Sequence, residues 1–508
     1  MLKKSLNRIK NPKEFGKSAT NFMLSTDGSL KKKVVRGGFW VFGLRVFRRG
    51  FEFVRTIVLA RLLAPEDFGL MGVALLAMSA LESFSQTGVQ QALIQKDEDI
   101  DEYLDTAWTI QVIRGLVIAG ILFFGAPLVG SFFGEPNAVP LTRALALSEI
   151  FKAFTHIGVV YFQKELEFHK QFNYQLSGTL VDLLVPVGVA TTIRSPMALI
   201  SGLVLGNLVR MLISYHVFEF SIIGFSLAKY KQLLNFGRWI SLGSVLSFFY
   251  TQGDDILLAK LLGTATLGYY QLAYQISNSP ATEITHVISK VTFPLYSKLQ
   301  SNSSRLCSAY LRSIRIITFI TTPMAFGVIF LAKDFTLQIL GEDWLPAVIL
   351  VKILAVWGLI RSYGAAWGPL FLAKGRPDIV TKLQFMKVFL LAILIVPLTL
   401  RYGAGGTAYA VVLNALVVSP IGLFFASNLI SIQMGRILEI IVPNLVSSCI
   451  MIVLLYLVRF IFFDVTSMLN LMILILVGII SYFFINTLVG TYLFPKQDNF
   501  ILFFKELL

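Results

Sequence analysis

Apolar runs of about 20 residues follow one another from residue 34 onward, separated by short polar or Gly- and Pro-containing turns. A helix of that length crosses the hydrocarbon core of a bilayer, where a helix satisfies all of its own backbone hydrogen bonds. The pattern predicts an all-α polytopic membrane protein with fourteen transmembrane helices. The predicted spans are 34–62, 68–94, 105–133, 139–161, 171–193, 196–220, 236–262, 267–293, 309–333, 345–373, 377–400, 404–430, 438–463 and 468–494.

An internal repeat groups these spans, because motifs of the first two spans recur in the seventh and eighth at a constant offset of 199 residues. Each copy holds six spans, an even number, so both copies begin on the same side of the membrane. We expect two six-helix pseudo-symmetric lobes, with a substrate path between them, plus two C-terminal helices. The matched segments are Gly38-x-Trp40 with Gly237-x-Trp239, Leu59-Ala60-Arg61-Leu62-Leu63 with Leu258-Ala259-Lys260-Leu261-Leu262, Gly69 with Gly268 and, further on, Phe133-Gly134-Glu135 with Leu340-Gly341-Glu342. The predicted parts are a basic N-terminal arm (1–33), an N-lobe (34–220), an inter-lobe linker (221–235), a C-lobe (236–430), and the last two helices with a tail (431–508).

The composition agrees with a membrane protein, since 56% of the 508 residues are hydrophobic and 14% are charged. The formal net charge of +15 does not indicate nucleic acid as a partner, because Lys and Arg also accumulate in the cytoplasmic loops of membrane proteins. If the N-terminus is cytoplasmic, the loops on that side collect most of the loop Lys and Arg residues, and the arm 1–33 lies on the cytoplasmic leaflet. We therefore expect a multi-pass protein with both termini in the cytoplasm and membrane lipids as partners.

The first span carries charged residues in its middle. At 100° per residue, Arg45, Arg48, Arg49, Glu52 and Arg55 fall on one face about 120° wide. Guanidinium groups in hydrocarbon cost from about 3 to more than 10 kcal/mol each, so this face must meet water or partner groups. Glu52 can neutralise one arginine, which leaves a surplus of positive charge. The pattern indicates a water-filled cavity for an anionic substrate; the alternative is that these residues pair with acids on neighbouring helices and join the bundle.

Four further basic residues in other spans are candidates to extend the substrate site. Each of them is equally compatible with a side chain that snorkels to the interface or pairs with a neighbour. They are Arg114, Arg210, Lys352 and Arg361.

Asp182 in the fifth span, and Glu283 with His286 in the eighth, are candidates for ion coupling. The alternative for each is a satisfied interior ion pair. Gly202 and Gly206 form a small-xxx-small pattern, which predicts close helix packing.

Other classes of chemistry lack their motifs. The chain has no GxxxxGK[ST] phosphate loop and no HExxH, and Cys307 and Cys449 have no metal-ligand or disulfide spacing. Enzymatic activity, a cofactor and a metal site are therefore not expected.

The loop after the first span reads Leu59-Ala60-Arg61-Leu62-Leu63-Ala64-Pro65-Glu66-Asp67-Phe68-Gly69. It resembles a signature of the O-antigen flippase type of polysaccharide transporter, in the multidrug/oligosaccharidyl-lipid/polysaccharide flippase superfamily. The turn Gly341-Glu342-Asp343-Trp344 and the helix-ending Lys374-Gly375-Arg376-Pro377 have the same character.

The resemblance implies export of an oligosaccharide on polyprenyl diphosphate, moved from the cytoplasmic to the outer leaflet of the bacterial plasma (inner) membrane by alternating access. It also implies surface polysaccharide biosynthesis, including the lipopolysaccharide O-antigen, with a polysaccharide polymerase or export machinery as a candidate partner. Arginine suits a diphosphate, because guanidinium binds phosphate in a bidentate manner.

Two other functions remain open. A cation-coupled multidrug antiporter of the same superfamily usually has twelve spans and an acidic cavity. A non-transporting membrane subunit of a polysaccharide export complex needs no charged face inside the membrane.

The repeat also predicts a gate. An offset of 199 from Arg55 leads to Asp254. In the related family the first and seventh helices face each other across the cleft, so an Arg55–Asp254 pair is expected to close the outer side. The alternative is that Asp254 pairs within its own lobe.

Overall fold

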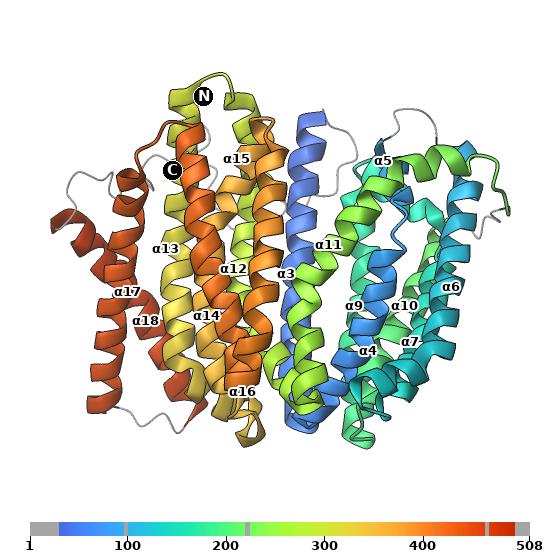
Figure 1. Cartoon of the computed structure of the whole chain (residues 1–508), viewed down its shortest axis with the longest axis horizontal. Coiled ribbons are helices and arrows are strands. Elements are labelled where there is room, and N and C mark those ends of the chain that lie inside the picture. The colour runs from blue at the N-terminus through green and yellow to red at the C-terminus, as the bar shows by residue number, and fades with distance from the viewer. Residues whose placement is uncertain (1–29, 96–99, 219–223, 463–466, 493–508) are drawn as a thin grey trace, which may run out of the picture. The chain divides into compact units, whose positions relative to one another are not determined.

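The computed structural model describes residues 30–95, 100–218, 224–462 and 467–492, and the regular elements within those ranges are all helical (Figure 1). Most of the predicted basic arm (residues 1–29), the start of the predicted linker (221–223) and the tail from residue 493 lie outside the described residues.

The long helices begin and end close to the predicted span boundaries. In chain order they are α3 (Leu30–Leu62), α4 (Pro65–Phe84), α6 (Asp101–Phe133), α7 (Ala138–Ala153), α9 (Phe168–Thr192), α10 (Met197–Val217), α11 (Tyr230–Leu262), α12 (Thr264–Leu299), α13 (Ser303–Phe335), α14 (Ala347–Tyr363), α16 (Pro377–Leu429), α17 (Met434–Phe462) and α18 (Met468–Tyr492). Short helices connect them: α5 (Val89–Gln95), η2 (Ile157–Val160), α8 (Tyr161–Lys164), η3 (Thr336–Leu340), η4 (Glu342–Trp344), η5 (Gly364–Ala366) and α15 (Trp367–Ala373).

Four predicted spans differ from the helices observed. The single span 68–94 is wrong, because α4 ends at Phe84 and a new helix, α5, follows Gly88, which has φ 66°. The span 139–161 bends by 77° between α7 and the helical segment Ile157–Lys164. The spans 377–400 and 404–430 run together in α16, which is kinked at Gly403 with φ 60° and ψ −144°.

Eight described helices are long and apolar enough to cross a membrane, or nine if the bent pair counts as one span. This confirms a polytopic membrane protein, whereas the count of fourteen spans stays a prediction. α3 is not among the eight, since charged residues lie in its middle.

Local sequence explains several helix ends. Pro65 opens α4, where its fixed φ suits the first helical turn and its missing N–H is not needed. The side chain of Asp67 accepts a hydrogen bond from the Ala64 N–H at 3.0 Å. Gly263, with φ 83°, makes the one-residue turn between α11 and α12. The side chain of Asn302 accepts from the Arg305 N–H and so caps α13.

The chain forms two compact units that divide some helices. Among the described residues, the first unit comprises 30–56, 81–95, 100–125, 142–218 and 224–244, and the second comprises 57–80, 126–141, 245–462 and 467–492. The end of α3 and most of α4, at 57–80, therefore group with the second half of α11 and with α12 to α18.

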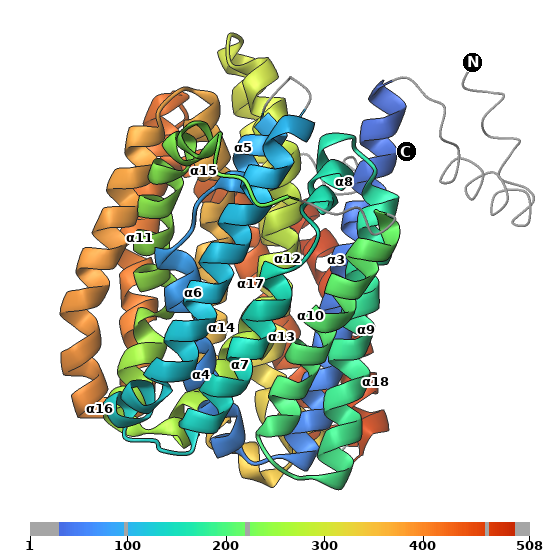
Figure 2. The ribbon, with the colours of Figure 1, turned by 90° about the vertical axis from the view of Figure 1, so that its right-hand side faces the viewer.

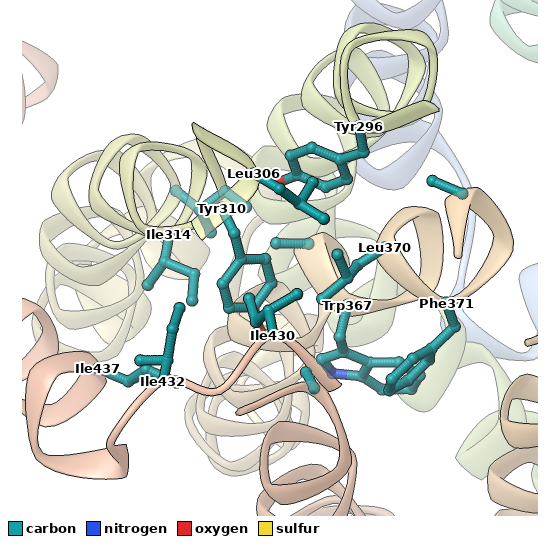
Figure 3. Packing of buried hydrophobic residues seen from close by; sticks show 14 of the residues in the cluster. Tyr296, Leu306, Tyr310, Ile314, Trp367, Leu370, Phe371, Ile430, Ile432 and Ile437 are labelled. Atoms are coloured by element: carbon teal, nitrogen blue, oxygen red, sulfur yellow. The ribbon is translucent and has the colours of Figure 1, made fainter. Parts of the chain in front are cut away.

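The core of the second unit is aromatic and aliphatic. Tyr296 and Tyr310 are fully buried, and Figure 3 shows the rings of Trp367 and Phe371 next to each other, 5.6 Å between centroids. In the same unit α17 and α18 lie side by side (Figure 1), joined by a hydrogen bond of 2.9 Å from the Tyr482 hydroxyl to the Asn444 side chain. A polar contact of this kind ties two helices together where the surroundings are apolar.

Candidate functional site

One side of α3 packs against α9 through aromatic rings. The rings of Trp40 and Phe47 lie 5.0 and 6.1 Å from the ring of Phe172, centroid to centroid. Gly43 faces the same ring, since a Cβ there would lie 3.9 Å from it. These residues pack α3 against α9, and the basic residues of α3 occupy other positions of the helix.

The carboxylate of Glu52 serves two arginines. It accepts a hydrogen bond of 2.8 Å from Arg49 and lies 3.4 Å from Nε of Arg48. The side chains of Arg48 and Arg49 are 50% and 39% exposed. One negative charge therefore balances two positive charges, as the sequence predicts.

Arg55 forms an ion pair with Asp182 of α9, with 2.6 Å between Nη1 and Oδ2. Both side chains are largely buried, at 23% and 14% exposure. The second oxygen of Asp182, Oδ1, is buried and has no hydrogen-bond partner among the described residues. Asp182, expected either to couple ions or to form an interior ion pair, thus forms the ion pair in this structure. The aromatic residues of α3 contact Phe172, and Arg55 further along α3 contacts Asp182 further along α9, so the two helices run in the same direction.

Arg210 of α10 lies against α9, the helix that carries Asp182. Its Nη1 donates to Asn207 at 2.8 Å, and Asn207 donates to Ser148 at 2.7 Å. The Nε atom of Arg210 is buried without a hydrogen-bond partner among the described residues. Gly178 of α9 makes room for the guanidinium group, since a Cβ at that position would lie 2.7 Å from its Cζ atom.

Glycines bring α9 and α10 together, and the two helices lie side by side in Figure 2. A Cβ on Gly206 would lie 2.9 Å from the Gly178 carbonyl oxygen, and one on Gly202 would lie 2.9 Å from Cδ of Pro186. The predicted close packing of the Gly202-xxx-Gly206 pattern is confirmed.

These side chains form what we call the arginine face. Its arginines outnumber the two carboxylates described beside it, those of Glu52 and Asp182. A guanidinium group presents planar donors that match phosphate and carboxylate oxygens. The arginine face consists of Arg45, Arg48, Arg49 and Arg55 of α3 with Arg210 of α10.

Arg114 has a different surrounding. It donates to the Ser85 carbonyl at 2.8 Å and to the Glu82 carbonyl at 2.9 Å. These carbonyls lie at the C-terminus of α4, where helix carbonyls lack partners and attract positive charge. Among the described contacts, Arg114 therefore terminates a helix and has none with the arginine face.

The remaining residues predicted to bind substrate or couple ions lie in the second unit; they are Glu283, His286, Lys352 and Arg361. Arg361 and His286 line a cavity of about 390 Å³, and Arg361 donates to the Thr282 hydroxyl. Lys352 and Glu283, both half-buried, are not among the residues that line it. Among the candidate substrate residues, four of α3 and Arg210 form the arginine face and Arg361 lines this cavity, whereas Arg114 and Lys352 belong to neither.

Asp254 is buried and accepts a hydrogen bond of 2.8 Å from the Tyr270 hydroxyl. Arg55 belongs to the first unit and Asp254 to the second, and each has a partner within its own unit. The Arg55–Asp254 gate stays a prediction.

Within the second unit, the start of α4 meets the start of α12 at equivalent positions of the repeat. A Cβ on Gly69 would lie 2.9 Å from Cα of Thr264, and one on Gly268 would lie 3.0 Å from the carbonyl carbon of Pro65. Gly268 lies 199 positions after Gly69, and Thr264 lies 199 positions after Pro65. The two contacts are therefore equivalent under the repeat, which is the pattern that a local two-fold axis produces. We call this contact the glycine junction.

Two basic residues flank the glycine junction, and they too are 199 positions apart. Arg61 donates to the carbonyls of Gln338 and Ile339, and Lys260 donates to the carbonyl of Phe132. In both cases the acceptors belong to the C-terminal turn of a helix or its extension. The indole of Trp344 adds a hydrogen bond of 2.9 Å to the Ala60 carbonyl.

The sequence analysis missed Lys387, which also lines the cavity of the second unit. Its signal was present: it is the one charged residue within the apolar stretch 383–400. An isolated lysine at that depth of a predicted span warrants the same attention as the arginines of α3.

Comparison with protein families decides the identity. Residues 58–349, more than half of the chain, match the family described as polysaccharide biosynthesis protein. The chain belongs to this family. This polysaccharide biosynthesis protein is 29% identical over 397 residues to the lipopolysaccharide biosynthesis protein WzxC of Escherichia coli (strain K12), covering 77% of the present chain and 80% of WzxC.

Two solved structures share the fold of this polysaccharide biosynthesis protein. The lipid II flippase MurJ in an inward closed conformation has a TM-score of 0.74 at 16% identity, covering 89% of the present chain and 99% of MurJ. A multidrug resistance MATE family transporter of the MOP superfamily, in an inward-facing conformation, has a TM-score of 0.57 at 18% identity, covering 75% and 95%. At these identities the two likenesses show a shared fold.

Proposed function

We propose that the protein is a flippase that moves an oligosaccharide on polyprenyl diphosphate from the cytoplasmic to the outer leaflet for surface polysaccharide biosynthesis. The arginine face is the contact for the diphosphate. The observation that carries this proposal is that the guanidinium groups of the arginine face, on α3 and α10, outnumber the carboxylates described beside them.

A diphosphate resolves the electrostatic problem of this face. Its negative charge is attracted to a face on which arginines outnumber the carboxylates of Glu52 and Asp182, and its oxygens accept bidentate hydrogen bonds. Three arginines of this face form ion pairs with Glu52 or Asp182. Arg48 and Arg49 are more exposed than Arg55, so they are best placed to exchange water for phosphate.

The proposal includes a bacterial inner-membrane location with both termini in the cytoplasm, fourteen spans and two lobes that alternate access to the substrate. Family membership supports the role in polysaccharide biosynthesis, and the likeness to MurJ supports a fold able to carry a flippase. Assembly with a polysaccharide polymerase belongs to the proposal as well.

A drug antiporter shares the superfamily, so it is the competing function. A cationic drug would meet like charge at the arginine face, which costs free energy instead of contributing affinity. A subunit that does not transport gains nothing from several arginines within one membrane helix, because each of them is costly to place there.

The experiment measures export in cells that depend on the protein. Arg48→Ala and Arg49→Ala are each expected to abolish export while the protein accumulates in the membrane at the parental level, because both side chains are already partly hydrated. Arg48→Lys is expected to restore only part of the activity, since an ammonium group cannot bind phosphate in a bidentate manner. Arg401→Ala, at an exposed arginine beside Tyr402 on α16, is the matched control.

Full activity of Arg48→Lys would refute bidentate recognition. Loss of the Ala variants from the membrane would indicate that the arginine face joins the helix bundle and has no role with the substrate.

A further inference from the structure

The cavity of the second unit lies between α11, α12, α14, α15 and α16 and has a volume of about 390 Å³. That volume falls in the range of small-molecule binding sites, about 300–1,000 Å³. Its positive charges are Arg361 of α14 and Lys387 of α16. Both side chains lie within predicted membrane spans and are half-buried.

Neither cation has an anionic partner among the described residues. The guanidinium group of Arg361 lies 4.6 Å from the ring centroid of Trp357. The ammonium group of Lys387 lies 5.2 Å from the ring centroid of Trp367 and 5.7 Å from that of Tyr250. Aromatic faces attract cations but leave their charge in place, so an anion entering the cavity gains from both groups.

Uncharged polar groups complete the lining. The indole N–H of Trp367, whose position Figure 3 shows, is buried without a hydrogen-bond partner among the described residues. Asn414 uses its side-chain N–H on the Lys387 carbonyl at 2.6 Å, which leaves its carbonyl oxygen as an acceptor. The hydroxyls of Thr285 and Ser419 line the same space. A ligand with several hydroxyl groups finds both donors and acceptors here.

We propose that this cavity binds a carboxylate-bearing sugar unit of the transported oligosaccharide. Lys387 and Arg361 hold the carboxylate, the hydroxyl and amide groups bind the sugar hydroxyls, and the rings of Trp367 and Tyr250 cover the apolar face of the sugar. This inference rests on the proposed function and names the class of substrate: an acidic glycan. A diphosphate has no apolar face that could pack against the aromatic rings of this cavity. We have already assigned the diphosphate to the arginine face.

The test uses the full-length protein, purified in detergent, and two probes that differ in one group: methyl glucuronide, which carries a carboxylate, and methyl glucoside, which does not. Isothermal titration measures the affinity for each. The parent protein is expected to bind the glucuronide at least tenfold more tightly than the glucoside.

Lys387→Met removes the charge and keeps the side-chain length. It is expected to weaken glucuronide binding about 10- to 100-fold and to leave glucoside binding unchanged, whereas Lys387→Arg retains most of the preference. Lys382→Met is the matched control, because Lys382 lies on the same helix with its side chain 78% exposed and outside the cavity. Arg361→Gln provides the same test should Lys387→Met fail to fold.

Equal affinity for the two probes, or parental glucuronide binding in Lys387→Met and Arg361→Gln, would overturn the proposal. Displacement of the glucuronide by an equal concentration of inorganic phosphate would also overturn it, since the cavity would then be a general anion site. Glucuronide binding is expected to survive Arg48→Ala. Unimpaired export by Arg48→Ala would therefore refute the proposed role of the arginine face without affecting the cavity.

Discussion

Gly69→Ala is expected to open the glycine junction. The new methyl group would lie 2.9 Å from Cα of Thr264 and closer still to its carbonyl carbon and oxygen, where the neighbour is backbone and cannot rotate away. Overpacking of this kind costs about 1–3 kcal/mol, which shifts a two-state equilibrium roughly 5- to 150-fold toward separation of α4 and α12. The effect of the substitution on the helix itself is favourable, because Ala stabilises a helix interior by about 0.5–1 kcal/mol relative to Gly.

The assay follows a buried reporter cysteine. Leu272 lies next to the junction and is 2% exposed, so Leu272→Cys, in a protein lacking Cys307 and Cys449, reacts with a polar thiol reagent only when the junction separates. In purified protein, Gly69→Ala is expected to raise the labelling rate roughly 5- to 150-fold.

The matched control is Gly243→Ala in α11, where a Cβ would meet nothing within 4 Å. It gains the same helix propensity without the clash and is expected to leave the labelling rate unchanged. An unchanged labelling rate in Gly69→Ala, or an equal increase in Gly243→Ala, would refute the view that this glycine closes the junction by shape.

Three further predictions concern charge and topology. Asp182→Asn is expected to lower thermal stability in detergent by about 1–2 kcal/mol, because it leaves Arg55 without its counter-ion at 23% exposure; an unchanged unfolding midpoint would show that water already screens the pair. Arg55→Asp and Asp254→Arg are each expected to impair export and the double variant to recover part of it, and absence of recovery with both proteins inserted would remove the support for the gate. A single cysteine in place of Arg194 is expected to react with an impermeant reagent outside intact cells and one in place of Lys164 is not; the reverse result would invert the orientation and the direction of transport.

Much of the helix framework could be predicted from the chain. Apolar runs of fixed length predict helices in a bilayer because no other local structure satisfies the backbone there, and the helices α3, α6, α9 and α11 end within a residue or so of the predicted boundaries. The failures lie where hydrophobicity continues through a break. Glycines 88 and 403 adopt positive φ between apolar segments, and hydropathy does not report backbone angle.

The candidate site divides in the same way. The positions of Arg48, Arg49 and Glu52 on one face follow from helical periodicity, so the sequence by itself determined that charge stripe and the insufficiency of its single carboxylate. Only the tertiary structure decided that Asp182 is the partner of Arg55, because the two are 127 positions apart and periodicity relates neighbours within one helix.

Distant packing also decided the remaining roles. Arg114 looked equivalent to the other buried arginines, yet it meets the carbonyls that end α4. Lys387 acquires significance only where α11, α14 and α15 bring Tyr250, Arg361 and Trp367 around it. The sequence determined which residues are costly to bury, since that cost belongs to each side chain alone. The tertiary structure decided what offsets the cost, since a partner group can come from any helix that the fold brings within reach.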